Sequence, residues 1–172
     1  MKFNEKTVSE NYLYKGKILS LRKDEIILPN GLGAVREVVE HSGGSCILCE
    51  VDEKILLVKQ FRYPYKEELL ELPAGKLNPG EDPMQTAIRE LEEEGGIKAD
   101  KVELMFEVYP SPGYTDEIIR IYKAVGITKT KAHLDDDEFL ECVWVEKQQL
   151  KQMIKDGKIK DGKTLIALLA IL

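Results

Sequence analysis

The chain has 172 residues and a formal net charge of −6, with 43% hydrophobic and 33% charged residues. This length and composition are typical of a soluble globular protein with one sizeable core, and the negative charge does not indicate a nucleic-acid-binding surface over the molecule as a whole. No apolar leader follows Met1, and the longest apolar run, residues 165–172, is too short to cross a bilayer. We therefore expect a cytoplasmic protein without membrane or nucleic-acid partners.

The first forty residues predict an antiparallel β unit. Turn formers divide this segment at Lys15-Gly16 and again at the run P-N-G-L-G, which ends at Gly33. The strands predicted between them are residues 6–14, 18–28 and 34–40. The small and polar run 41–45 predicts a boundary, so we place the β unit at residues 1–42 and the main domain at residues 43–172.

The main domain combines strands with a few helices. Its predicted strands are residues 46–51, 55–61, 69–72, 102–109, 118–125 and 139–145. Cys46 and Cys49 point to opposite faces of the first of these strands, so we interpret them as core residues rather than as metal ligands. Two helices are predicted at the end of the chain, residues 148–156 and 163–172, and the second should be buried because it is apolar nearly all round. The mixture indicates an α/β or α+β fold.

The stretch 75–97 predicts a loop, a helix and a sharp stop. Asp82 is a good N-cap, Pro83 suits the first helical position, and Gly95 and Gly96 offer a C-terminal stop. The apolar residues of the helix recur at helical spacing and form one stripe that should be buried, namely Met84, Ala87, Ile88 and Leu91.

Three glutamates, Glu90, Glu93 and Glu94, share an adjacent arc of this helix. Glu90 and Glu94 are four residues apart, where like charges repel, and this cost is explained if a divalent cation lies between them. Hard oxygen ligands on one helix face suit Mg²⁺ or Mn²⁺. The alternative is a solvated acidic face, which is the usual meaning of a glutamate run.

The stretch 75–97 also matches every fixed position of the Nudix box, G-x5-E-x7-R-E-U-x-E-E-x-G-U with U aliphatic, so the chain resembles the Nudix superfamily. The resemblance implies a mixed β-sheet sandwiched between helices and hydrolysis of a nucleoside diphosphate linked to another group. It also implies Mg²⁺, with Mn²⁺ as a possible substitute, held by the carboxylates of Glu90, Glu94 and Glu93, the last as ligand or close support, and by the carbonyl of Ala74. Arg89 would orient a glutamate, either Glu81 or Glu93.

Two further stretches resemble the ADP-ribose pyrophosphatases of this superfamily. Arg62 follows Q-F, as in their Q-x-R stretch, and could stack on a base or bind a phosphate, the alternative being a plain surface arginine. Arg36 and Glu37 lie in a segment similar to their N-terminal R-E-V, which in that family reaches the nucleotide bound by the other subunit. The resemblance therefore implies a homodimer with an exchanged N-terminal β unit.

A third stretch, S-P-G-Y-T-D-E at residues 111–117, resembles the S-P-G-x-[ST]-x-E segment of ADP-ribose and nucleotide-sugar hydrolases. Pro112 lies 15 residues after Ile97, as the proline of that group does after the box. The resemblance implies that Pro112, Gly113 and Glu117 bind substrate. No G-x-S-x-G turn surrounds the serine of this stretch, so it is not predicted to be a nucleophile.

The acidic run at residues 135–138 resembles a family loop whose glutamate has been assigned as the general base. Asp136 occupies that position here and is one methylene shorter, whereas Glu138 keeps the other acidic position. We therefore expect Glu138, Asp136 or the box glutamate Glu93 to act as the base. A solvated charge run is the alternative for each member of the loop.

Together these resemblances imply an Mg²⁺-dependent pyrophosphatase that converts ADP-ribose to AMP and ribose 5-phosphate. A hydrolase of another nucleoside diphosphate sugar, such as GDP-mannose, is the alternative within the same class. An idle Nudix-like module that binds nucleotide and regulates another protein is the alternative of a different class, and three clustered glutamates argue against it.

Overall fold

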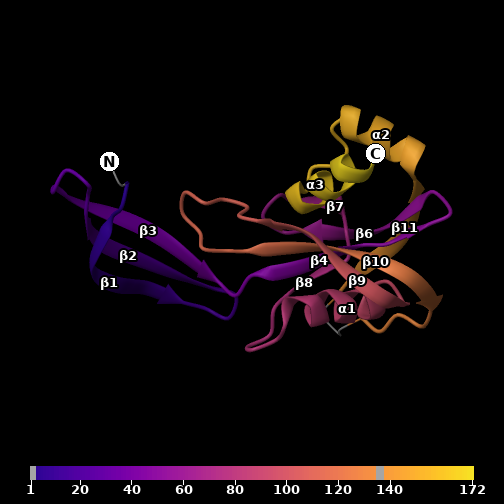
Figure 1. Cartoon of the computed structure of the whole chain (residues 1–172), viewed down its shortest axis with the longest axis horizontal. Coiled ribbons are helices and arrows are strands. Elements are labelled where there is room, and N and C mark those ends of the chain that lie inside the picture. The colour runs from indigo at the N-terminus through magenta and orange to yellow at the C-terminus, as the bar shows by residue number, and fades with distance from the viewer. Residues whose placement is uncertain (1–2, 135–137) are drawn as a thin grey trace. The chain divides into compact units, whose positions relative to one another are not determined.

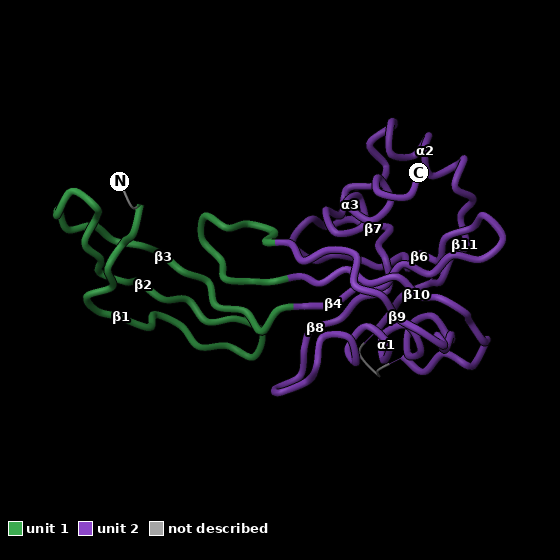
Figure 2. The backbone as a smooth tube through the Cα atoms, viewed as in Figure 1, with its two compact units in different colours: residues 1–43, 109–118 green, residues 44–108, 119–172 purple. Residues whose placement is uncertain are grey.

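The computed structural model describes residues 3–134 and 138–172. The chain forms two compact units (Figure 2). Unit 1 comprises Met1–Gly43 together with Tyr109–Ile118, and unit 2 comprises Gly44–Val108 and Ile119–Leu172. Unit 1 therefore includes a segment that our sequence-based division assigned to the main domain.

Unit 1 is built on an antiparallel sheet in the order β1-β2-β3, with β1 at Lys6–Lys15, β2 at Leu19–Ile27 and β3 at Gly33–His41. These strands agree with the predicted ones to within one residue at each end. Gly31 has φ of +86°, a left-handed conformation that favours glycine, in the turn between β2 and β3. The pattern of turn formers was therefore sufficient to place all three strands.

The segment Tyr109–Ile118 is attached to the end of β3. The Val39 N–H donates to the Tyr114 carbonyl over 2.7 Å, and the Asp116 N–H donates to the Val39 carbonyl over 3.2 Å. The Asp116 carboxylate also accepts from the His41 N–H over 2.9 Å. The S-P-G-Y-T-D-E stretch is thus held by the strand that carries Arg36 and Glu37.

Unit 2 contains a mixed sheet in the order β8-β4-β10-β9, in which β10 runs parallel to β4 and the other pairs are antiparallel. A second, antiparallel sheet has the order β11-β6-β5, with β7 also paired to β6. The strands are β4 (Gly44–Leu48), β5 (Glu50–Val51), β6 (Lys54–Arg62), β7 (Glu67–Glu71), β8 (Ala74–Lys76), β9 (Ile97–Val108), β10 (Ile119–Lys129) and β11 (Leu140–Glu146).

The helices of unit 2 lie on opposite sides of these strands (Figure 1). Helix α1 (Pro83–Glu93) covers one side, and α2 (Lys147–Lys155) and α3 (Gly162–Ile171) cover the other. Both core strands β4 and β6 are buried on both faces, so that alternate residues enter two separate hydrophobic clusters. On the α1 side the cluster includes Ile47, Cys49, Leu56, Ala87 and Leu91, and on the α2–α3 side it includes Cys46, Leu48, Leu57, Leu150 and Leu168. The predicted arrangement of a mixed sheet between helices is confirmed.

Several details differ from the expected elements. Strand β9 begins at Ile97, before the predicted strand 102–109, and β10 continues to Lys129, beyond the predicted strand 118–125. The predicted strand 46–51 is divided into β4 and β5, and β5 turns into β6 through Asp52 and Glu53, whose φ angles are +47° and +60°. Strand β8 was predicted as a loop. Helix α3 is not buried all round, because Ile166 and Leu169 are 38% and 66% exposed. Among the described residues, no helix is both long and apolar enough to cross a membrane.

Candidate active site

Helix α1 is set by local signals at both of its ends. The Asp82 carboxylate accepts hydrogen bonds from the N–H groups of Met84 (2.9 Å) and Gln85 (3.3 Å), and Pro83 is the first helical residue. After the helix, Gly96 has φ of +61°. The helix therefore begins and ends where the sequence predicts, but its predicted apolar stripe is only partly buried, because Ala87 and Leu91 are buried whereas Met84 is 38% exposed. The helix directs Glu90 and Glu94 toward the protein interior, where they are 5% and 3% exposed.

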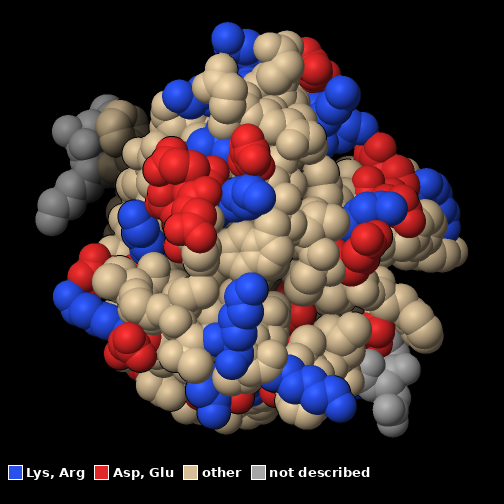
Figure 3. All heavy atoms as spheres, turned by 90° about the vertical axis from the view of Figure 1, so that its right-hand side faces the viewer, with Lys and Arg blue, Asp and Glu red and all other residues tan. Residues whose placement is uncertain are grey.

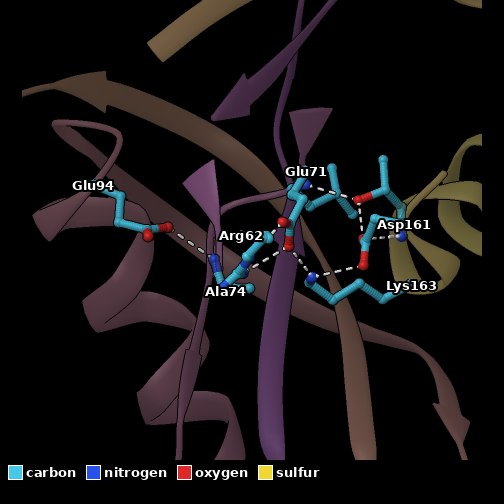
Figure 4. A network of polar contacts seen from close by, with 8 residues as sticks. Arg62, Glu71, Ala74, Glu94, Asp161 and Lys163 are labelled. Atoms are coloured by element: carbon cyan, nitrogen blue, oxygen red, sulfur yellow. Dashed lines mark hydrogen bonds and ion pairs between the residues drawn. The ribbon is translucent and has the colours of Figure 1, made fainter. Parts of the chain in front are cut away.

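The two buried carboxylates lie against strand β8. The Ala74 N–H donates to Glu94 Oε2 over 2.8 Å (Figure 4). A Cβ atom added at Gly75 would lie 1.6 Å from Glu90 Oε1, so only glycine leaves room for this carboxylate. The first glycine of the Nudix box is thus explained by the close approach of Glu90 to the backbone of β8.

Burial makes these carboxylates costly to ionise. It raises the pKa of Glu90 to about 7, with the neighbouring charges of Glu93 and Glu138 adding to the increase and Arg89 opposing it. Burial likewise raises the pKa of Glu94 to about 8, with a further increase from the charges of Glu90 and Glu138. A cation beside the pair would offset both costs.

Arg89 holds the acidic side chains of the box together. Its Nε donates to Glu81 over 2.9 Å, and its Nη1 donates to Glu90 and to Glu93, each over 2.7 Å. The sequence suggested Glu81 or Glu93 as the partner, whereas the structure shows contacts with both and also with Glu90. These contacts lower the pKa of Glu81 to about 2.

The residues present fit a divalent cation by their chemistry. Glu90 and Glu94 supply hard oxygen atoms from one face of the helix, and Glu90 occupies a space beside Gly75 that a Cβ there would fill. Among residues 3–134 and 138–172, no three His, Cys, Asp or Glu side chains are already gathered as a metal cluster. The fit therefore depends on this buried pair, with Glu93 still bound to Arg89.

The charge of the candidate base Glu138 affects the same pair of glutamates. Its charge contributes to the raised pKa of both Glu90 and Glu94, which places it within electrostatic range of them. Asp136, the other candidate of the acidic loop, lies outside the described residues. Glu138 thus lies within electrostatic range of the box carboxylates that the resemblance assigns to metal.

Arg62 is engaged by a partner that the sequence analysis missed. Its Nε and Nη2 donate to the two carboxylate oxygens of Glu71 over 2.6 and 2.7 Å. The side chain of Arg62 is still 38% exposed, whereas that of Glu71 is 2% exposed. The sequence did carry a signal for this pair, namely a single acid inside the apolar run L-L-E-L. An acid is rarely buried unless it is paired, so a basic partner could have been expected.

The remaining predicted substrate residues lie in unit 1. Arg36 pairs with Glu5, and Glu37 is exposed on the same strand. Pro112, Gly113 and Glu117 lie on the segment that is attached to β3, and a Glu117 oxygen lies 3.3 Å from His41 Nδ1. The structure therefore gathers these residues into one unit, while the metal-binding candidates and Arg62 belong to unit 2.

Comparison with known proteins decides the family. The NUDIX domain family matches residues 34–168. The chain belongs to the Nudix family. The membership predicted from the box is therefore confirmed, and with it the assignment of the chain as a hydrolase of this family, whose members generally need a divalent metal. A second family, the nucleoside diphosphate sugar hydrolase N-terminal domain, matches residues 5–39.

Named relatives of this Nudix protein span most of its length. It is 41% identical to a methanol dehydrogenase activator of Bacillus methanolicus, over 96% of this chain and 91% of that protein. It is 40% identical to an ADP-ribose pyrophosphatase of Bacillus subtilis (strain 168), over 95% and 90%. A GDP-mannose pyrophosphatase of Yersinia enterocolitica is 36% identical, over 84% and 82%. The fold resembles an ADP compounds hydrolase with a TM-score of 0.86 and 19% identity, over 98% and 93% of the two chains.

Proposed function

We propose that this Nudix protein is a Mg²⁺-dependent pyrophosphatase that hydrolyses ADP-ribose to AMP and ribose 5-phosphate. The observation that carries the proposal is the buried pair Glu90 and Glu94, cradled against Ala74 and Gly75. A protein that only bound nucleotide would have no need to bury two like charges. The relatives named ADP-ribose pyrophosphatase support the choice of substrate, because they match nearly the whole chain.

In this proposal the box would hold the metal, and bound Mg²⁺ would polarise the diphosphate, offset its charge and make bound water more acidic. Glu90, Glu94 and the Ala74 carbonyl are the proposed ligands, with Glu93 as a ligand or close support. Arg89 orients these glutamates through the contacts described above.

The proposed hydrolysis adds water across the P–O–P bridge. The water oxygen bonds to one phosphorus, the bridging oxygen leaves with the other, and a proton of the water passes to a carboxylate base. Glu138 is our first choice of base because it lies in electrostatic range of the box glutamates. Asp136 and Glu93 are the other candidates.

Substrate binding is proposed to use the residues that the resemblance assigns to it, with a contribution from a second copy of the chain. Arg62 of unit 2 is the proposed phosphate contact, while Arg36 and Glu37 would reach the nucleotide in the site of the partner copy. The proposed contacts of the loop after β9 are Pro112, Gly113 and Glu117. Nucleic acid is not a proposed partner, and the face in Figure 3 carries acidic and basic side chains in small mixed groups.

The proposal is tested by incubating the protein with a panel of nucleotide sugars, with Mg²⁺ and with chelator, and separating the products by chromatography. We expect AMP and ribose 5-phosphate from ADP-ribose, no turnover in chelator, and restoration by Mg²⁺ or Mn²⁺. Full activity in metal-free buffer would overturn the metal requirement.

The same panel of nucleotide sugars distinguishes the proposed function from a GDP-mannose hydrolase and from a regulatory module. A kcat/KM for GDP-mannose above that for ADP-ribose would favour the second substrate. Nucleotide binding without turnover of any compound would favour a regulatory module, a role suggested by the relative named methanol dehydrogenase activator. The cytoplasmic location stays a prediction.

A further inference from the structure

A buried network of alternating charges connects helix α3 to Arg62. Glu71, at the end of β7, binds Arg62 through both of its oxygens and also accepts from Lys163 of α3 (Figure 4). Lys163 in turn donates to Asp161 over 3.0 Å. Burial by itself raises the pKa of Glu71, but the hydrogen bonds and charges of Arg62 and Lys163 outweigh it and lower this pKa to about 2. Glu71 is therefore ionised whenever the protein is folded near neutral pH.

The far end of the network is fixed by the cap of α3. The Asp161 carboxylate accepts from the Thr164 N–H over 3.0 Å and from the Thr164 hydroxyl over 2.6 Å. The Thr164 hydroxyl oxygen accepts from the Leu72 N–H over 2.9 Å. Lys163 is 10% exposed and has little freedom to move away from Glu71.

On its other side, the network is connected to the proposed metal site by the chain itself, because only residues 72 and 73 separate Glu71 from Ala74. The Pro73 carbonyl accepts from the Ile47 N–H over 3.0 Å, and the Ala74 N–H donates to Glu94 over 2.8 Å. The charges of Arg62 and Glu94 are close enough to affect one another's pKa. Arg62 thus lies within electrostatic range of two carboxylates, and its hydrogen bonds are to Glu71.

This choice of partner matters for metal binding. An arginine that paired with Glu94 would compete with a cation for the same oxygens. A buried set of charges is also weak evidence for stability, because well-packed apolar residues of similar volume are often as stable. The network is better explained by what it does to Arg62 than by the stability that it contributes.

We propose that Glu71, supported by Lys163 and Asp161, is a positioning residue that keeps Arg62 away from Glu94, so that Glu94 stays available to the cation and the Nη1 group of Arg62 faces the diphosphate. The inference rests on the proposed function, since it assumes a cation at Glu94. The two hydrogen bonds to Glu71 use Nε and Nη2 of Arg62, so this pair does not occupy Nη1.

The test measures Mn²⁺ binding by calorimetry, without substrate, in wild type and in Glu71→Gln. Glu71 is not a proposed ligand, yet we expect the variant to bind Mn²⁺ about 10- to 100-fold more weakly, the usual effect of losing a group that supports a metal ligand. Adding Arg62→Met to this variant should restore most of the affinity, because the competing guanidinium is then absent. Arg62→Met alone should keep Mn²⁺ binding and lose kcat/KM.

The matched control is Glu67→Gln, which removes another carboxylate of β7 whose partner, Lys160, is exposed. It should leave Mn²⁺ affinity unchanged. Far-UV circular dichroism and urea unfolding establish that each variant is folded. Should Glu71→Gln not fold, Glu71→Asp keeps the negative charge but withdraws the carboxylate by one methylene from both Arg62 and Lys163, and a smaller loss of Mn²⁺ affinity is expected.

Two results would contradict the inference. One is unchanged Mn²⁺ affinity in a folded Glu71 variant, and the other is a loss of affinity that Arg62→Met does not reverse, which would indicate a merely structural role. Failure of the wild type to hydrolyse any nucleotide sugar would instead contradict the proposed function, and the calorimetric comparison would still decide the role of Glu71.

Discussion

At the scale of single residues, Glu94 allows catalysis and stability to be separated. Replacing it with Gln keeps an oxygen that can accept from the Ala74 N–H but removes the buried charge. We expect kcat to fall by roughly 10²–10³, the effect of losing one preorganised electrostatic group, while the melting temperature in chelator at pH 8 stays the same or rises. Glu92→Gln on the same helix, where the partner is Lys98, is the control and should affect neither quantity.

The pH dependence of stability follows from the same pair. The pKa of Glu90 is about 7 and that of Glu94 about 8, both above the ordinary value of 4.5. The folded protein therefore binds more protons than the unfolded chain at pH values between this ordinary value and the raised ones. Stability in chelator should therefore decrease as pH rises from about 5 to about 8. Because a cation competes with these protons, Mg²⁺ should raise the melting temperature more at pH 8 than at pH 6. A flat profile in chelator would contradict this prediction.

The identity of the base is tested kinetically. Glu138→Gln and Asp136→Asn are compared, and the true base should lose kcat while KM changes little. We expect the larger loss for Glu138, since its charge acts on Glu90 and Glu94. If both variants keep a kcat near that of wild type, the loop is a solvated charge run and the base must be sought among Glu93 and Glu117.

At the scale of elements, the approach of α1 to β8 leaves no room for a side chain at Gly75. Gly75→Ala would place a methyl group 1.6 Å from the present position of Glu90 Oε1, so the helix and the strand must move apart. We expect a loss of stability of about 1–3 kcal/mol, typical of overpacking, and a loss of activity in the fraction that folds. Gly162→Ala in the first turn of α3 is the control, because a Cβ there meets nothing within 4 Å. Urea unfolding measures both variants.

Elements whose signals are local were predictable from the sequence. Helix α1 was placed by its cap and its glycine stop, and the strands of unit 1 by their turn formers. Strand β8 was missed because three residues carry no periodicity, and it exists only through pairing with β4. The network of Glu71, Lys163 and Asp161 was missed because it is not local either. These residues are up to 92 positions apart and become neighbours only through packing.

At the scale of the whole molecule, unit 1 leaves large apolar side chains in water. Val8, Leu13 and Tyr14 of β1 are 58%, 54% and 59% exposed, and a three-stranded sheet cannot bury both of its faces by itself. We expect a second copy of the chain to cover part of this surface. Light scattering should show a dimer at the concentrations used for activity, and an active monomer would contradict this expectation.

Whether the partner also completes the site can be decided by mixing two inactive variants. Arg36→Ala would disable the N-terminal segment and Glu94→Gln the metal site, each on its own chain. If Arg36 serves the site of the partner, a heterodimer contains one site with both residues intact and one with neither. Unfolding and refolding an equal mixture should then restore activity at about one quarter of the sites, because about half of the dimers are mixed and half of their sites are intact. If Arg36 serves its own chain, every site in the mixture carries one defect, and the activity stays at the level of the separate variants.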